Sequence, residues 1–222
     1  MPKEMKCYLI RHGITEGNKT RSFSGSRTDE PLSAEGREVL RQIDNVTGGA
    51  ILFSSPMKRA IETASIMLPG LDPVIIDELR EMDFGDFEGK NHSQLDGDPK
   101  YQEWLDSGGS MPIPGGESIK GFRERAYSGF CEALRIAKEK CSESMYIVAH
   151  GGTIMALMSC LTGEDYYTFN LPNGAGYEIE LETDDGGNVL AATAYDRFFG
   201  GLRDGSSDWR PPQFSPSDKM DR

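Results

Sequence analysis

The stretch Leu9-Ile10-Arg11-His12-Gly13 and its distant counterpart Ile147-Val148-Ala149-His150-Gly151-Gly152 decide the fold prediction. Each is an apolar run that ends in a histidine and a glycine, which is typical of a short buried strand followed by a turn. A single histidine in that place is most often structural, so the prediction depends on the pairing. In open α/β sheets, ligands bind beyond the carboxyl ends of the strands. If the two strands are neighbours, both rings face one small ligand, and the planar guanidinium of Arg11 indicates a phosphate or carboxylate.

The next part of the chain alternates predicted helices and strands. Ser33 is expected to cap a helix that runs to about Val46, and residues 50–54 form the next strand. Pro56 fits the first turn of the helix that follows this strand, and Arg59 is therefore expected in that turn. Free backbone amides and the helix dipole favour an anion there, so Arg59 is a candidate phosphate ligand.

The second half of the chain continues the alternation. Residues 74–76 form a short strand that leads to Glu81, and the Gly-, Pro- and polar-rich stretch 84–118 is expected to be a cap beside the site. In this stretch, Tyr101 and Trp104 could form an aromatic wall, but their helical spacing favours packing within a short cap helix. A helix follows Glu117, then a strand at 145–149, a helix at 152–161 and a hairpin of 177–183 with 189–195. The apolar stripe of the first of these helices is assigned to the core; it consists of Ile119, Phe122, Ala126, Phe130, Ala133, Leu134 and Ala137.

Length, charge and cysteine content narrow the classes of function. With 222 residues, the chain is long enough for one well-buried α/β domain and short for two. A net charge of −12 argues against nucleic acid and anionic membranes as partners. The four cysteines show neither CxxC pairing nor zinc-site spacing, so reduced thiols and no metal site are expected. The sequence shows no apolar leader or membrane-spanning run, and a cytoplasmic location is expected.

Several separate segments occur in one order along the chain. After Arg11-His12-Gly13 they are Thr15, Asn18, Phe23-Ser24-Gly25, Pro31-Leu32-Ser33-Ala34-Glu35-Gly36, Ser54-Ser55-Pro56, Arg59-Ala60, Thr63-Ala64, Leu79-Arg80-Glu81, Phe84-Gly85, Phe87-Glu88-Gly89 and Gly115-Gly116-Glu117-Ser118. In this order the series resembles the histidine phosphatase superfamily, in its phosphoglycerate-mutase-like branch, over residues 5–196. Residues 81–89 and 114–118 are most similar to the small phosphatases of that branch that include α-ribazole phosphatase.

The resemblance implies a fold and a domain organisation. The expected fold is a three-layer α/β/α sandwich with a mostly parallel central sheet and a small cap insertion at 84–118. Residues 1–200 would form a single domain, and residues 201–222, rich in Gly, Ser and Pro, a loosely held tail.

The resemblance also implies roles for the site residues. His12 would be the nucleophile that forms a phosphohistidine. Arg11, Arg59 and His150 would hold the phosphate oxygens, with His150 charged beside the dianion because no carboxylate is expected near it. The remaining phosphate-binding residues are Asn18 and Ser24, through hydrogen bonds, and Gly13, Gly25 and Gly151, through close backbone approach.

Glu81 is the proton donor that the resemblance implies. A carboxyl beside a bound dianion and apolar neighbours is expected to have a raised pKa, so it can carry a proton near neutral pH. Asp83, Asp86 and Glu88 lie close in sequence and remain alternatives.

These residues predict a phosphatase that needs no metal ion and no cofactor. It would act on small phosphorylated metabolites, with α-ribazole 5′-phosphate as one candidate. A phosphoglycerate mutase is the alternative, but the segment between Glu81 and His150 is short, and its part before the Glu117 helix is open and polar. A more solvated site favours hydrolysis. A non-catalytic phospholigand-binding or scaffold module is a third option. It is disfavoured because the residues with central roles are all present, namely Arg11, His12, Arg59, Glu81 and His150. The oligomeric state stays open, with a homodimer as one option.

Overall fold

The computed structural model describes residues 3–42, 50–109, 111–184, 186, 188–199 and 202–203. The predicted end of a helix at Val46 and most of the predicted tail lie outside these residues. Of residues 201–222, only the pair 202–203 is described, and it forms a strand. The boundary near residue 200 and the cap role of 84–118 stay predictions.

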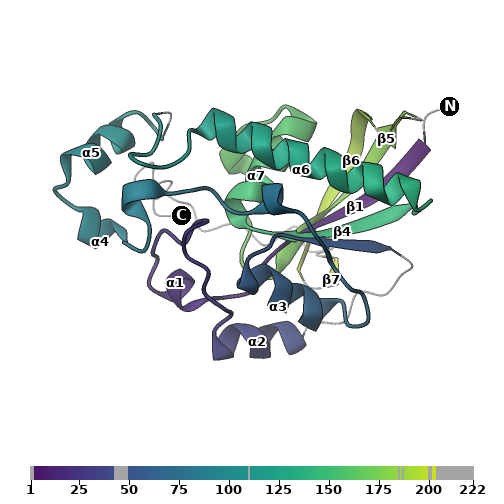
Figure 1. Cartoon of the computed structure of the whole chain (residues 1–222), viewed down its shortest axis with the longest axis horizontal. Coiled ribbons are helices and arrows are strands. Elements are labelled where there is room, and N and C mark those ends of the chain that lie inside the picture. Colours follow the sequence, from purple (N-terminus) through teal and green to yellow (C-terminus); the bar gives the residue numbers. More distant parts are fainter. Residues whose placement is uncertain are drawn as a thin grey trace.

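A mixed sheet forms the centre of the described structure, in the order β3-β2-β4-β1-β5-β6-β7 (Figure 1). Its first four strands in that order are parallel, and the pairs from β1–β5 outward are antiparallel. The strands are β1 (Lys3–Arg11), β2 (Ile51–Ser54), β3 (Val74–Ile75), β4 (Ser144–Ala149), β5 (Ala175–Thr183), β6 (Val189–Phe199) and β7 (Leu202–Arg203). The predicted neighbours β1 and β4 do pair, with Arg11 opposite Ala149, and the predicted hairpin is β5–β6.

Helices cover both faces of the sheet, with α6 and α7 on one side and α2 and α3 on the other (Figure 1). The helices are α1 (Glu16–Lys19), α2 (Ala34–Arg41), α3 (Lys58–Met67), α4 (His92–Leu95), α5 (Pro99–Asp106), α6 (Ile119–Glu139) and α7 (Gly151–Thr162), with the 3₁₀ turns η1 (Asp77–Leu79), η2 (Gly85–Phe87) and η3 (Tyr166–Phe169). Ser33 caps α2 as predicted, because its hydroxyl accepts from the Gly36 amide. The three-layer α/β/α fold is therefore confirmed, with the parallel strands on one side of the sheet and an antiparallel extension on the other.

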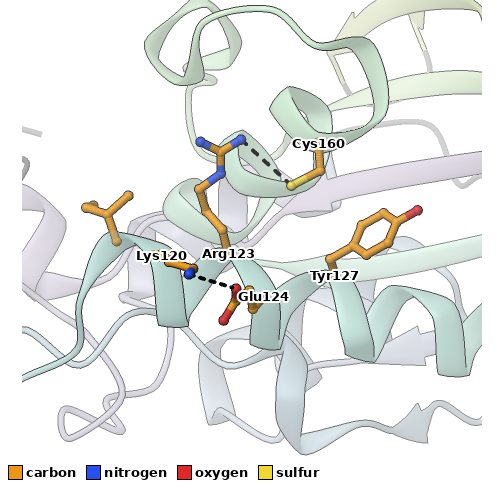
Figure 2. A pocket seen from close by; sticks show the side chains of 6 residues that line it. Lys120, Arg123, Glu124, Tyr127 and Cys160 are labelled. Carbon is orange, nitrogen blue, oxygen red and sulfur yellow. Dashed lines mark hydrogen bonds and ion pairs between the residues drawn. The ribbon is translucent and has the colours of Figure 1, made fainter.

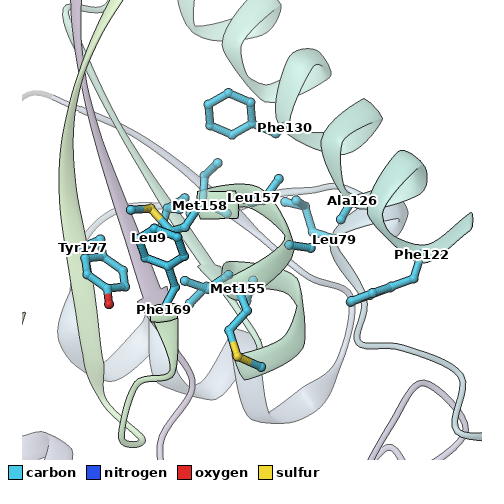
Figure 3. Close-up of a cluster of buried hydrophobic side chains, with 14 of the residues drawn as sticks. Leu9, Leu79, Phe122, Ala126, Phe130, Met155, Leu157, Met158, Phe169 and Tyr177 are labelled. Carbon is cyan, nitrogen blue, oxygen red and sulfur yellow. The ribbon is translucent and has the colours of Figure 1, made fainter. Parts of the chain in front are cut away.

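Side chains that alternate along the strands supply two cores. Leu9 and Ile147 face the core under α6 and α7, together with Phe130 and Leu157 (Figure 3). Ile10 and Val148, one residue further along each strand, belong to the core on the opposite face with residues of α2 and α3. This period of two is what a strand covered on both faces requires, and it fixes the register that brings the ends of β1 and β4 together. No helix within the described ranges is long and apolar enough to span a bilayer.

The segment 84–118 carries α4 and α5, which lie at the left end of the molecule, away from the labelled strands β1, β4, β5 and β6 (Figure 1). Tyr101 and Trp104 are buried and pack with Phe23 and Phe87 through edge-on ring contacts. The predicted packing role for these two aromatics is confirmed. The His92 Nδ1 atom lies 3.2 Å from the Tyr101 hydroxyl and so joins the same cluster.

Candidate active site

His12 and His150 meet where β1 and β4 end. Their ring centroids are 5.2 Å apart, and the His12 amide donates to the Ala149 carbonyl at 3.0 Å, which continues the parallel ladder by one residue. Only 4% of the surface of His12 and none of that of His150 is exposed. The prediction that the two strand ends bring these rings close together is therefore confirmed.

A hydrogen bond to its own turn fixes the tautomer of His12. Its Nδ1 atom lies 2.7 Å from the Gly13 carbonyl oxygen, which can only accept, so Nδ1 carries the hydrogen. Burial, followed by the charges of Arg59 and Arg11, lowers the pKa of His12 well below its ordinary value. Both effects favour the neutral form of the ring, which has its lone pair on Nε2.

Arg59 lies in the first turn of α3, as predicted, with no exposed surface. Its Nε donates to His150 Nδ1 at 3.2 Å, and its two amino groups donate to the carbonyls of Thr28 at 2.6 Å, Gly25 at 3.1 Å and Ser24 at 3.3 Å. Burial lowers the pKa of this guanidinium, and nearby carboxylates, Glu81 first, oppose the shift. The side chain thus connects the second histidine to the loop 24–28.

Glu88 holds that same loop from the other side. Its carboxylate accepts from the amides of Arg27 at 2.7 Å, Thr28 at 2.9 Å and Gly25 at 3.1 Å. Burial raises the pKa of Glu88 and these amide bonds oppose the rise. Because both oxygens are engaged by backbone, Glu88 belongs to the support of the loop.

The other two acidic alternatives to Glu81 form ion pairs at the surface. Asp83 pairs with Arg27 at 2.8 Å, and Asp86 pairs with Lys100 at 3.1 Å. Among the described residues, neither side chain is hydrogen-bonded to a residue of the two histidine turns.

Glu81 is the acidic residue that lies at the start of α7, against the Gly152 amide. Its Oε2 accepts from the Gly152 amide and its Oε1 from the Met82 amide, each at 2.9 Å. Burial raises the pKa of this carboxyl, while the two amides and the charges of Arg59 and Arg11 oppose the rise. Residues 79–81 pack against the first turn of α7, where the Thr153 hydroxyl donates to the Leu79 and Arg80 carbonyls, and this packing brings the Glu81 carboxylate to the Gly152 amide.

Arg11 packs against the first residue of α7. A Cβ atom on Gly151 would lie 3.2 Å from the Arg11 Cζ atom, so the missing side chain makes room for the guanidinium. The NH1 group of Arg11 donates to the Leu171 carbonyl. Gly13 has a different constraint, since a Cβ there would lie 2.7 Å from the Leu40 Cδ1 atom. Packing against α2 therefore accounts for Gly13 without reference to a ligand.

Asn18 and Ser24 have structural partners. The Asn18 Oδ1 atom accepts from the Thr15 amide at 3.1 Å and from Asn173 Nδ2 at 3.0 Å, and the Ser24 hydroxyl donates to Glu30 at 3.1 Å. The predicted contacts of these two side chains with phosphate stay predictions.

Comparison with known proteins decides the family. The sequence profile described as "Histidine phosphatase superfamily (branch 1)" matches residues 7–194. The chain belongs to this superfamily. It is 35% identical to "Putative phosphoserine phosphatase 2" of Hydrogenobacter thermophilus, over 80% of this chain and 90% of that protein. Such relatives identify the chain as a phosphatase enzyme.

Solved structures of the superfamily share the fold. A structure described as "a putative alpha-ribazole-5'-P phosphatase" of Escherichia coli has a TM-score of 0.71 and 26% identity, and covers 86% of this chain and 96% of its own. Phosphoglycerate mutase from Thermus thermophilus has a TM-score of 0.60 and 33% identity, with coverages of 86% and 99%.

Four supporting residues of this histidine phosphatase were not predicted. Ser55 lies 2.7 Å from His150 Nε2, and Thr63 accepts from the Gly13 amide at 2.9 Å. Asn173 donates to the His12 carbonyl at 3.1 Å, and Glu30 accepts from the Gly17 amide at 3.1 Å. Ser55 and Thr63 occur in the motif segments of the sequence, so the motifs could have identified them. Asn173 and Glu30 follow no local pattern.

A surface groove between α6 and α7 is formed by other residues (Figure 2). Its volume is about 700 Å³, and it is lined by Ile119, Lys120, Arg123, Glu124, Tyr127 and Cys160. None of the predicted site residues contributes to it. In the described residues, no group of three or more His, Cys, Asp or Glu side chains is arranged to hold a metal ion.

The contacts of Arg59 predict that this residue is needed for stability even without a ligand. Arg59→Ala would leave three loop carbonyls and His150 Nδ1 without a donor, so we expect the free energy of unfolding to fall by about 2–4 kcal/mol. Urea denaturation of the ligand-free protein measures this. Lys58→Ala is the matched control, since Lys58 is exposed and pairs only with Asp29, and a loss of at most about 0.5–1 kcal/mol is expected there. An equally small loss for Arg59→Ala would show that the loop does not depend on the guanidinium.

Proposed function

We propose that the protein hydrolyses small phosphomonoesters through a phosphohistidine on His12, without a metal ion. The observation that carries this proposal is the placement of His12, a buried ring whose Nδ1 bond to Gly13 leaves Nε2 available. His150 stands 5.2 Å away, and Arg59 and Arg11 bring two positive charges that lower the pKa of both rings. A neutral nucleophile among cations fits an anionic substrate.

In the first step, the Nε2 atom of His12 attacks phosphorus, and the P–N bond forms as the bond to the leaving oxygen breaks. Arg11, Arg59 and His150 stabilise the charge on the equatorial oxygens. Glu81 donates its proton to the leaving alkoxide. In the second step, Glu81 takes a proton from water as the water oxygen attacks phosphorus, and the products are neutral His12 and inorganic phosphate.

The environment of Glu81 supports its role as the acid. Burial is the largest influence on this carboxyl and raises its pKa, which favours the protonated form. A bound dianion would raise the pKa further, because it adds a negative charge beside the carboxyl. Asn18 and Ser24, with the backbone of Gly13, Gly25 and Gly151, are proposed to complete the contacts with phosphate.

The substrate class rests on the relatives. Proteins similar to this chain are named for phosphoserine and for α-ribazole 5′-phosphate, and both compounds are small alkyl phosphomonoesters. We infer a small phosphorylated metabolite of this kind, and these two compounds are the first to test. Arg11, Arg59 and His150 supply the charge stabilisation that a metal ion would otherwise provide.

The first prediction concerns the nucleophile. Rapid mixing with ³²P-labelled substrate, followed by alkaline denaturation, should trap labelled protein, because phosphohistidine is stable in base and labile in acid. His12→Ala should remove the label. His92→Ala, which removes the histidine beside Tyr101, should keep it. Label that persists in His12→Ala would move the nucleophile elsewhere, and a complete absence of turnover and label would favour a binding module.

Hydrolysis and phosphoryl transfer between sugar acids can be separated directly. Relatives named phosphoglycerate mutase make this test necessary. With 3-phosphoglycerate and a bisphosphoglycerate primer, we expect interconversion to be much slower than release of inorganic phosphate from the preferred monoester. Fast isomerisation without phosphate release would establish the mutase alternative.

The role of Glu81 depends on the leaving group. p-Nitrophenolate leaves without a proton, whereas an alkyl alkoxide needs one, so Glu81→Gln should slow an alkyl phosphomonoester at least about tenfold more than p-nitrophenyl phosphate in kcat/KM. In the wild type, the alkyl reaction should also fall as pH rises through the raised pKa of Glu81, since the acid loses its proton there.

Asp83→Asn, Asp86→Asn and Glu88→Gln are the controls for this leaving-group effect. Each removes one alternative acid, and the two substrates should respond equally in all three variants. A selective loss on the alkyl substrate at one of these positions would reassign the acid.

A further inference from the structure

His150 has one hydrogen-bond partner at each ring nitrogen. Its Nδ1 lies 3.2 Å from Arg59 Nε, and its Nε2 lies 2.7 Å from the Ser55 hydroxyl oxygen. All three side chains have no exposed surface, so water does not replace either partner.

The chemistry of these partners determines where the hydrogen of His150 is. A guanidinium N–H can only donate, so Nδ1 offers its lone pair to Arg59. A neutral imidazole then carries its single hydrogen on Nε2, and Ser55 accepts it. The Ser55 oxygen also accepts from the Met57 amide at 3.3 Å, and its two lone pairs are enough for both donors.

We propose that Ser55 is a positioning residue that fixes His150 in the Nε2–H tautomer, and that binding of a phosphate dianion is coupled to uptake of one proton at His150 Nδ1. This inference rests on the proposed function only for the identity of the ligand. It assigns opposite tautomers to the two histidines of the free enzyme, because His12 carries its hydrogen on Nδ1.

The contact with Arg59 explains the coupling. In the free site, a proton on Nδ1 would face the Arg59 Nε–H, which places two donors against each other. An oxygen of a bound phosphate can accept from both of them, and its charge favours the imidazolium. The proton comes from solvent, and no bond to phosphorus forms or breaks in this step.

The charges around His150 agree with a neutral ring in the free enzyme. The groups that face it are Arg59 from α3, Arg11 and His12 at the end of β1, and Arg125 from α6. Burial and these groups together lower its pKa well below the ordinary value. The charged state expected for His150 from the sequence therefore belongs to the complex with phosphate.

Nitrogen-15 NMR of histidine-labelled protein tests the assignment directly, because the chain has only three histidines. His92→Gln identifies the signals of the third ring, and the expected free-enzyme pattern is Nδ1–H for His12 and Nε2–H for His150. Saturation with inorganic phosphate at pH 8 should protonate both nitrogens of His150. An Nδ1–H tautomer of His150 in the free enzyme, or a neutral ring in the saturated complex, would overturn the proposal.

Substitution of Ser55 tests its role through a pH profile of phosphate affinity between pH 7.5 and 10. A hydrogen bond to a charged donor is stronger than one to a neutral donor, so Ser55→Ala should disfavour the imidazolium and shift the alkaline fall in affinity about one unit to lower pH. Calorimetry in buffers of different ionisation enthalpy should show about one proton taken up per wild-type site and less in this variant at the same pH. Ser55→Thr keeps the hydroxyl and should restore both values.

Ser54→Ala is the matched control. Ser54 is equally buried, but its hydroxyl donates to the Ser55 carbonyl and not to His150, so the profile should stay in place. An unshifted profile in Ser55→Ala would also overturn the proposal. Failure of the wild type to bind phosphate would contradict the proposed function and the coupling to proton uptake. The role of Ser55 in fixing the tautomer would then be decided by NMR of the free enzyme, which is measured without a ligand.

Discussion

The buried guanidinium of Arg59 is the interaction on which the rest of the site depends. It is a charge with no exposed surface, and such a group is tolerated only where hydrogen bonds replace water. Four of its N–H groups have acceptors, three of them carbonyls of the loop 24–28 and the fourth His150. The loop is therefore built around the side chain, and α3, the loop and the end of β4 are held together by one residue.

The carboxylates near the site accept hydrogen bonds from backbone amides, although the chain as a whole is acidic. Glu88 and Glu30 each accept from backbone amides of the segments that surround the site, and Glu81 accepts two amides at the start of α7. The net charge of −12 is a property of the whole surface and is screened over about 10 Å in salt. Within the site, the charge of the fully buried Arg59 is screened least by salt, and both Arg59 and Arg11 act on the two histidines.

The sequence was sufficient where local pattern and sheet rules agree. The apolar runs before His12 and His150 predicted two strands, the position after Pro56 placed Arg59 in a first helical turn, and each was confirmed. Glu81 followed from resemblance, and its place beside Gly152 could not be derived from spacing, because it requires the 79–81 segment to pack on α7 across the molecule. Asn173 and Glu30 were missed for the same reason, since they act through backbone groups far away in sequence. The small size of Gly13 serves packing against Leu40, and this contact could not be read from the motif; the predicted contact of its backbone with phosphate stays a prediction.

The two histidines differ because their backbones differ. His12 is followed by a carbonyl within reach of its own ring, whereas His150 begins α7, so its ring finds its partners on other elements, in Ser55 and Arg59. The first arrangement leaves Nε2 as a lone pair that can bond to phosphorus, and the second occupies both nitrogens of a ring that has to hold oxygens. In the proposed mechanism, His12 is prepared for attack before any ligand arrives, while His150 changes its hydrogen-bond partners to receive one. Two similar strand ends in the sequence therefore supply two different chemistries, and the difference is set by residues that lie outside both stretches.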